Sequence, residues 1–162
     1  MLNLKTQTFF KLVFIISLVS IISAYYIEYI LGHQPCNLCL IERIPYGISI
    51  FLIITNNIIK KNDNFFIILL VLIFIFSFII SVYHFGIEQG FFQESSVCDI
   101  KNISEIISKE ELLEQLSKKT VSCKDVTFRI FGFSLTTFNI LISLILVIFL
   151  TKIFKDYEKF KK

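Results

Sequence analysis

Long apolar blocks separated by short polar segments dominate the hydrophobic pattern of this 162-residue chain. A helix needs about 20 apolar residues to cross the roughly 30 Å hydrocarbon core of a bilayer. Four blocks have that length, at residues 12–31, 40–59, 65–87 and 130–151. Each is much longer than the roughly ten alternating residues of a transmembrane β-strand. The pattern predicts an all-α integral membrane protein, a four-transmembrane-helix bundle that forms a single membrane domain over residues 1–162.

The composition agrees with this prediction. Hydrophobic residues make up 55% of the chain and charged residues 18%, against roughly 25% charged in an average soluble domain. A formal net charge of only +3 argues against a nucleic-acid-binding surface. The first block follows two lysines, as a signal peptide would, but its apolar stretch is too long and no clear cleavage site follows. We therefore expect it to be a retained helix.

The distribution of charge predicts the orientation in the membrane. Nine lysines and three acidic residues flank the side that holds both termini and the segment between the second and third blocks, whereas the other side holds seven basic and ten acidic residues. Cytoplasmic loops carry the excess of Lys and Arg, so both termini are expected in the cytoplasm. A short loop at about residues 32–39 and a long loop at about 88–129 then face outward.

All four cysteines fall in these two outward loops. Cys36 and Cys39 lie in the short loop, and Cys98 and Cys123 in the long one. The outward compartment is the oxidising one, where disulfides form and persist. An even number of cysteines suggests two disulfides, for which four cysteines allow three connectivities.

Cys36 and Cys39 form a C-x-x-C motif where the second helix is expected to begin. Two intervening residues give a small, reducible ring, which is typical of redox chemistry rather than of structural bridges. The positive end of the helix dipole and Arg43, one turn further on, would both stabilise a thiolate. We therefore expect a lowered thiol pKa at Cys39.

Three further ionisable residues lie near the outer membrane boundary: Glu42, Arg43 and His84. Ionisable residues in membrane spans are functional hypotheses by default. Arg43 could instead pair with Glu28 of the first helix. His84 could hydrogen-bond a carbonyl ligand or be a structural histidine at the interface.

Two other interpretations of the cysteines compete with a redox role. All four could ligate one zinc ion, although no metal is our expectation. Alternatively, two purely structural disulfides could stabilise a non-enzymatic, tetraspanin-like membrane scaffold, but the Cys-Cys-Gly motif of tetraspanins is absent.

Two segments resemble the bacterial disulfide bond formation protein B (DsbB) family. The sequence Pro-Cys-Asn-Leu-Cys-Leu-Ile-Glu-Arg-Ile-Pro-Tyr at residues 35–46 is similar to the family signature, and Tyr-His-Phe-Gly-Ile-Glu at 83–88 is similar to a second family segment. The layout of helices, loops and cysteines matches over nearly the whole chain. The similar vitamin K epoxide reductase-like proteins differ, because their quinone-side C-x-x-C comes late in the bundle. The chain also departs from many DsbB relatives in having no Trp.

The resemblance implies a thiol:quinone oxidoreductase of the bacterial inner membrane, expected to be a monomer with periplasmic cysteine loops. Its partner would be a periplasmic DsbA-like dithiol oxidase, and its cofactor a quinone, either ubiquinone or menaquinone. The implied disulfides are Cys36–Cys39 and Cys98–Cys123. Cys98 would form the mixed disulfide with the partner, and Cys123 would then exchange with Cys36. Cys39 would be released beside a quinone bound by Arg43, with Glu42 and His84 lining the pocket.

Overall fold

Four long helices make up most of the computed structural model, which describes residues 2–59, 63–93, 122–124, 128–130 and 132–161. They are α1 (Leu2–Tyr25), continued by the short π-helix η1 (Tyr26–Ile30), α2 (Asn37–Ile59), α3 (Asp63–Glu88) and α5 (Leu135–Lys161). Within the described residues, all four are long and apolar enough to cross a membrane. The prediction of an all-α, four-helix membrane protein is confirmed.

The helices differ from the expected ranges mainly at their ends. α1 already begins at Leu2, and α5 continues to Lys161, because an apolar block marks only the part of a helix that suits the bilayer. At the other end of α5 the expectation was wrong. Ile130, Phe133 and Ser134, predicted as helix, belong to the antiparallel strands β1 (Arg129–Ile130) and β2 (Phe133–Ser134). Gly132 makes the tight turn with a φ of 85°, which glycine adopts without steric cost.

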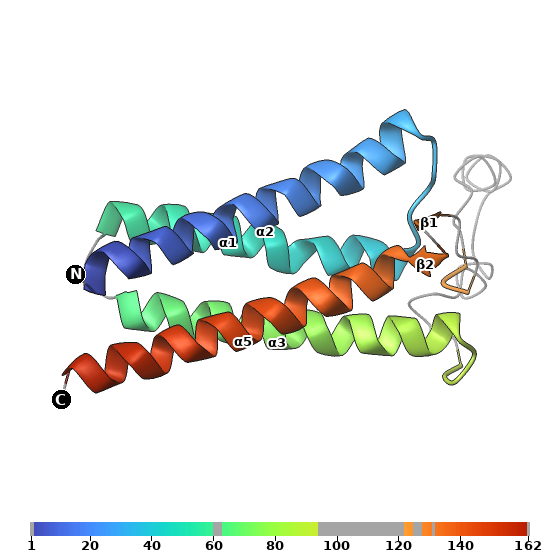
Figure 1. Ribbon diagram of the computed structural model, residues 1–162. Coiled ribbons are helices and arrows are strands. Elements are labelled where there is room, and N and C mark those ends of the chain that lie inside the picture. Colours follow the sequence, from blue (N-terminus) through green and yellow to red (C-terminus); the bar gives the residue numbers. More distant parts are fainter. Residues whose placement is uncertain (1, 60–62, 94–121, 125–127, 131, 162) are drawn as a thin grey trace, which may run out of the picture.

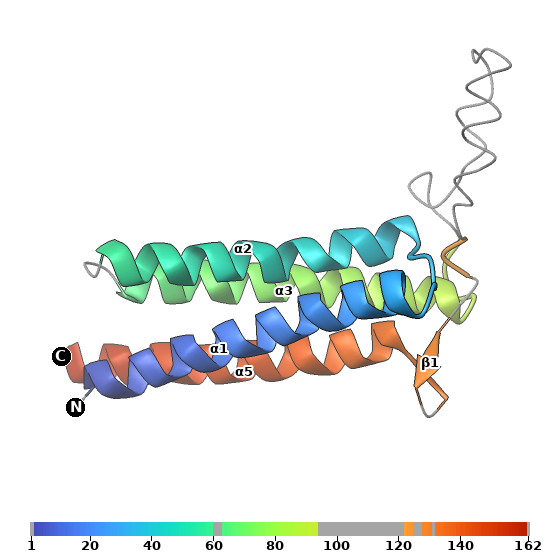
Figure 2. The ribbon, with the colours of Figure 1, turned by 90° about the horizontal axis from the view of Figure 1, so that it is seen from above.

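The bundle has one loosely packed side. α3 lies along α5 over the most extensive interface, and α2 packs against both α1 and α3, whereas α1 meets α5 only sparsely. Figures 1 and 2 show both termini at one end, as the orientation argument requires, and α1 diverging from α5 toward the other end. Residues of both helices, including Ile21 of α1 and Ile142 of α5, line a cavity near the cysteines.

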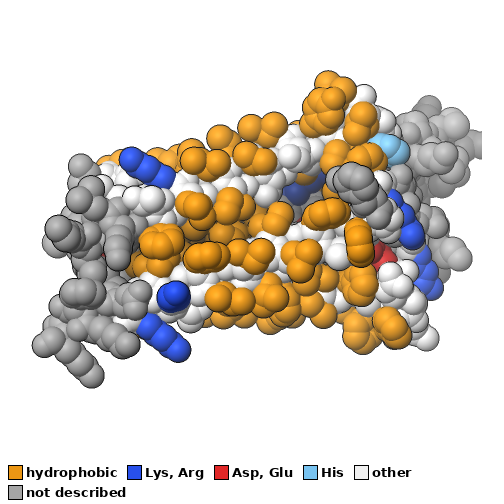
Figure 3. All heavy atoms as spheres, in the orientation of Figure 1, with side chains coloured by type: hydrophobic (Ala, Val, Ile, Leu, Met, Phe, Trp, Pro, Cys, Tyr) orange, Lys and Arg blue, Asp and Glu red, His pale blue; other side chains and the backbone are white. Residues whose placement is uncertain are grey.

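Apolar side chains cover the outside of the helices. Figure 3 shows them distributed along the length of the bundle, and many large ones are more than half exposed, including Ile15, Phe51 and Leu72. In water such a surface would be strongly unfavourable, but in lipid it is the expected exterior. The chain is thus a multi-pass membrane protein.

Inside the bundle, two apolar clusters lie on either side of a polar layer. The larger cluster contains Tyr46, Phe74 and Leu146, and the smaller one contains Cys36, Leu38, Ile87 and Cys123. The side chains between them along α2, α3 and α5 are polar and buried: Glu42, Ser81, His84 and Thr136. Burying polar groups is costly unless they are hydrogen-bonded. A buried polar layer inside an apolar bundle is therefore the first candidate for a functional site.

Candidate functional site

Cys36 caps the N-terminus of α2. The amide of Leu40 donates to the carbonyl oxygen of Cys36 at 3.2 Å, and the amide of Cys39 donates to Cys36 Sγ at 3.3 Å. This is the bonding pattern of an N-cap residue, in which a side-chain oxygen is the usual acceptor. Here a sulfur takes that position, at the positive end of the helix dipole.

The two sulfurs of the C-x-x-C lie 2.7 Å apart, and both cysteines are free. A disulfide requires about 2.05 Å, so the expected Cys36–Cys39 disulfide is not formed in this structure. Both cysteines are in the free form in this structure, with their sulfurs in direct contact. The disulfide remains a prediction for the oxidised form.

The contacts that stabilise a thiolate converge on Cys36. The Cys39 thiol, as hydrogen-bond donor, lowers the pKa of Cys36 most, burial opposes this effect, and His84, with Nε2 at 3.5 Å from Cys36 Sγ, lowers the pKa further. The sequence argument assigned the thiolate to Cys39. The structure instead places the lowered pKa on Cys36, chiefly because the Cys39 side chain donates to it and His84 lies beside it, while the backbone amide of Cys39 contributes least.

A pH profile of alkylation tests the assignment. The lowered pKa keeps Cys36 a thiolate below the pKa of about 8.5 of a free thiol, so its iodoacetamide reaction, followed by mass spectrometry, should change little between pH 9 and 7. In Cys39→Ala, which lacks the main stabilising donor, the profile should shift toward higher pH. A wild-type rate that falls about tenfold per pH unit over this range would contradict the assignment.

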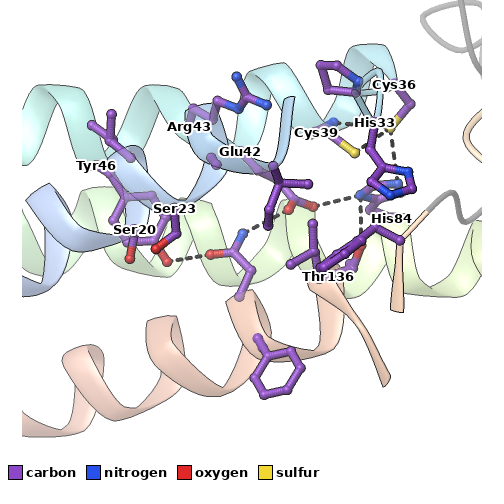
Figure 4. Close-up of a pocket in the computed structure, with 18 of the residues that line it drawn as sticks. Ser20, Ser23, His33, Cys36, Cys39, Glu42, Arg43, Tyr46, His84 and Thr136 are labelled. Atoms are coloured by element: carbon purple, nitrogen blue, oxygen red, sulfur yellow. Dashed lines mark hydrogen bonds and ion pairs between the residues drawn. The ribbon is translucent and has the colours of Figure 1, made fainter. Parts of the chain in front are cut away.

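His84 connects the sulfur to two buried carboxylates. Its ring is only 1% exposed, and Nδ1 donates to Glu42 Oε1 at 2.9 Å. Thr136 Oγ1 lies 3.3 Å from the same nitrogen and donates to Glu88 Oε1 at 2.6 Å. Figure 4 shows His84 between Cys36 on one side and Glu42 and Thr136 on the other. Groups on α2, α3 and α5 are thereby joined to the sulfur.

Asn139 of α5 donates a hydrogen bond to the second carboxylate oxygen of Glu42. Its Nδ2 donates to Glu42 Oε2 at 2.9 Å and to Ser81 Oγ at 2.7 Å, while its Oδ1 accepts from the Tyr46 hydroxyl. Both carboxylate oxygens of Glu42 therefore have partners. A network satisfied in this way fixes the orientation of its members.

Arg43 leaves α2 in a different direction from Glu42 (Figure 4). It donates to Glu28 Oε2 at 2.5 Å and lies over the Tyr25 ring, 5.2 Å from its centroid. Glu28 belongs to η1, and π-helical turns occur often at functional sites. The Arg43–Glu28 pairing that the sequence suggested as an alternative is therefore present, and Arg43 is held at the wall of the site.

A cavity of about 320 Å³ brings these groups together. Its lining includes Cys36, Cys39, Glu42, Arg43 and His84, and apolar residues of α1 and α5 form much of its wall. In Figure 3 the surface is hollowed near the loop end of the bundle. The volume is at the lower end of the range for small-molecule sites.

Cys123 lines the same cavity. It is 3% exposed, packs in the apolar cluster of Cys36 and is disulfide-bonded. Its expected partner, Cys98, lies outside the described residues. Three of the four expected catalytic cysteines and all three expected pocket residues therefore line one cavity.

Sequence reasoning missed five residues of the network: Tyr46, Ser81, Glu88, Thr136 and Asn139. A signal existed for Asn139, because it is a lone amide in an otherwise apolar block and such residues tend to face the bundle interior. No such signal exists for Thr136, because threonine and serine hydroxyls are common in membrane helices. Tyr46 and Glu88 stand within the two segments that resemble the DsbB family.

Comparisons with known proteins place the chain in a family. Residues 6–153 match the family described as Disulfide bond formation protein DsbB. An uncharacterized protein of Rickettsia prowazekii (strain Madrid E), RP370, is 33% identical over 137 residues, which cover 83% of this chain and 80% of that protein. No solved structure matches. With four membrane-spanning helices and a C-x-x-C lining an internal cavity, the chain belongs to the DsbB family of disulfide bond formation proteins.

Proposed function

We propose that this protein is a thiol:quinone oxidoreductase of the bacterial inner membrane that reoxidises a periplasmic DsbA-like dithiol oxidase. Both termini would lie in the cytoplasm, with the cysteine loops in the periplasm. The observation that carries the proposal is the shared cavity, because it is lined by the C-x-x-C, by the disulfide-bonded Cys123 and by Arg43. Cys123 and the C-x-x-C therefore face a common space in which thiol–disulfide exchange between them can take place.

The proposed exchange balances as two transfers of an electron pair, first from the partner to the loop cysteines and then from the loop cysteines to the C-x-x-C. The reduced partner attacks the Cys98–Cys123 disulfide through Cys98, so that the partner leaves as a disulfide and the loop pair becomes a dithiol. Cys123 then attacks Cys36 of the oxidised C-x-x-C, and Cys39 is the leaving thiolate. A second exchange within the loop restores Cys98–Cys123 and leaves Cys36 and Cys39 reduced. Such exchange requires an attacking thiolate and an accessible sulfur.

A quinone fits the cavity by its size and by the chemistry of its lining. The apolar wall suits a lipid-soluble ring, and Arg43 offers a charged donor to a carbonyl oxygen. A bound quinone would accept the two electrons and two protons of the dithiol. Cys36 and Cys39 supply the electrons, while His84, Glu42 and Asn139 form a hydrogen-bonded path that can hold a proton beside the sulfur. Neither ubiquinone nor menaquinone is favoured by this lining.

Quinone reduction by the purified protein in detergent tests the proposal. A reduced DsbA-like oxidase supplies electrons, and quinone loss is followed by absorbance. Wild type should turn over, and Arg43→Ala should raise KM for quinone by about tenfold or more, since a hydrogen bond to a charged group is worth roughly 1.5–3 kcal/mol.

Arg129→Ala is the matched control, because Arg129 is exposed on β1 and should leave KM unchanged. No turnover by folded wild type with either quinone would overturn the proposal. Equal KM values for the two arginine variants would remove Arg43 from the binding site.

A further inference from the structure

Two sulfurs and an imidazole nitrogen converge beside the cavity. Cys36 Sγ, Cys39 Sγ and His84 Nε2 all lie within 4.8 Å of one another, and Cys36 and His84 are both buried. Two thiolates and one imidazole are a ligand set that zinc accepts, as in sites with Cys₂His ligation and one further ligand.

The ring of His84 is oriented for ligation. Nδ1 lies 2.9 Å from Glu42 Oε1, so a ring that gives up its Nε2 proton on binding a metal would keep the other proton on Nδ1 and direct the Nε2 lone pair at the sulfurs. Metal-bound histidines nearly always donate their other nitrogen to a carboxylate or carbonyl in this way. Asn139 holds the second oxygen of Glu42, so the carboxylate is itself fixed.

Glu88 supplies an independent observation. Its side chain is 6% exposed, with Oε1 3.8 Å from His84 Nε2, and it lines the same cavity. Oε1 accepts from Thr136, but Oε2 is buried without a hydrogen-bond partner among the described residues. A buried carboxylate oxygen without a partner is costly, and a cation would satisfy it.

We propose that the reduced protein binds one thiophilic divalent ion of the Zn²⁺ class through Cys36, Cys39 and His84, with Glu88 as the fourth ligand. This inference goes beyond the proposed function and does not depend on the quinone. It differs from the expectation of no metal and from the four-cysteine site considered from sequence.

The separations between the two sulfurs and His84 Nε2 need only local adjustment, whereas the Glu88 carboxylate, which does not lie within 4.8 Å of all three atoms, would have to turn toward the ion. With Zn–S bonds of 2.3 Å, tetrahedral geometry places two sulfurs roughly 3.8 Å apart and a sulfur and nitrogen roughly 3.6 Å apart. Cys36 Sγ and His84 Nε2 are already 3.5 Å apart. The sulfurs, at 2.7 Å, would separate by about an ångström, which a side-chain rotation of Cys39 provides.

Binding would depend on the oxidation state of the pair. The metal ligand is the thiolate, and each thiol loses its proton when it binds. A Cys36–Cys39 disulfide has no thiolate to offer, so the ion would bind only the reduced pair. Once bound, it would prevent the two cysteines from passing electrons to an acceptor. The metal would therefore act as an inhibitor of the reduced state.

Cobalt binding to the full-length chain tests this proposal. In a Cys98→Ser/Cys123→Ser background, Cys36 and Cys39 are the only cysteines. After reduction and anaerobic removal of reductant, Co²⁺ should bind one per chain, with thiolate charge-transfer absorption and tetrahedral visible bands, and Zn²⁺ should displace it. The disulfide form should bind at least 100-fold more weakly.

Glu88→Gln should weaken Co²⁺ binding about tenfold or more. Glu28→Gln is the matched control, because Glu28 faces Arg43, and its affinity should stay within twofold. Circular dichroism checks that each variant is helical. Equal binding to both redox forms, no thiolate band, wild-type affinity in Glu88→Gln, or binding that requires Cys98 and Cys123 would each overturn the proposal.

Discussion

Replacing Cys39 with serine should reduce quinone turnover at least about 1,000-fold, because the loss of a residue that forms the covalent intermediate removes the reaction path. A serine hydroxyl cannot form a disulfide with Cys36, so the electron pair cannot pass from the C-x-x-C to the quinone. The helix start should survive, since Cys39 contributes only its backbone amide to the cap. Steady-state quinone reduction with a reduced DsbA-like oxidase measures the loss.

The same variant should also accumulate an intermediate. Cys36 retains its sulfur and lies in one apolar cluster with Cys123, so a Cys36–Cys123 disulfide should become visible by mass spectrometry after acid quenching. Cys36→Ala is the matched control, which should lose both turnover and this linkage. Turnover above about a tenth of wild type in Cys39→Ser would mean that electrons leave through another group.

Replacing Asn139 with leucine should destabilise the folded protein by about 2 kcal/mol or more. The change removes the partner of Glu42 Oε2 and of the Ser81 and Tyr46 hydroxyls. Each buried polar group left without a partner costs roughly 1–3 kcal/mol, although a hydrogen bond between membrane helices is on average worth only about 0.6 kcal/mol. Ser81 keeps its bond to the Ser77 carbonyl, so the cost falls mainly on Glu42 and Tyr46, and it should be measurable by unfolding in mixed detergent micelles.

Asn57→Leu provides the control for that measurement. It is the same substitution at an exposed position of α2, where the free energy of unfolding should change by less than about 0.5 kcal/mol. Turnover should fall only in Asn139→Leu, because Glu42 and His84 lose a fixed orientation there. Equal stability of the two variants would show that the polar layer is not held by Asn139.

The sequence was sufficient to predict the four helices, because each carries an apolar block long enough for a bilayer. It could not place their ends. At the start of α5, the apolar residues Ile130 and Phe133 suggested helix, but Gly132 allows a hairpin turn, and Ser134 accepts the amide of Thr137 at 3.4 Å as a cap. Local turn chemistry prevailed there over hydrophobic pattern.

The candidate site was predictable where residue type and spacing carry chemistry. The C-x-x-C, Glu42, Arg43 and His84 were expected to lie together, and all line one cavity. Asn139 could not be added, because an amide in an apolar helix does not reveal which neighbour it faces. The choice between Cys36 and Cys39 as thiolate depended on the contacts of the two sulfurs with each other and with His84, which the spacing along the chain does not reveal.

Because Cys36 Sγ caps α2, the oxidation state of the Cys36–Cys39 pair should affect the backbone at the start of this helix. A thiolate is a strong acceptor for the Cys39 amide, whereas a disulfide sulfur is neutral and accepts weakly. Oxidation of Cys36 should therefore loosen the first helical turn and speed exchange of the Cys39 amide hydrogen with deuterium. Hydrogen exchange at this one amide would then report the redox state of the motif without any attached label.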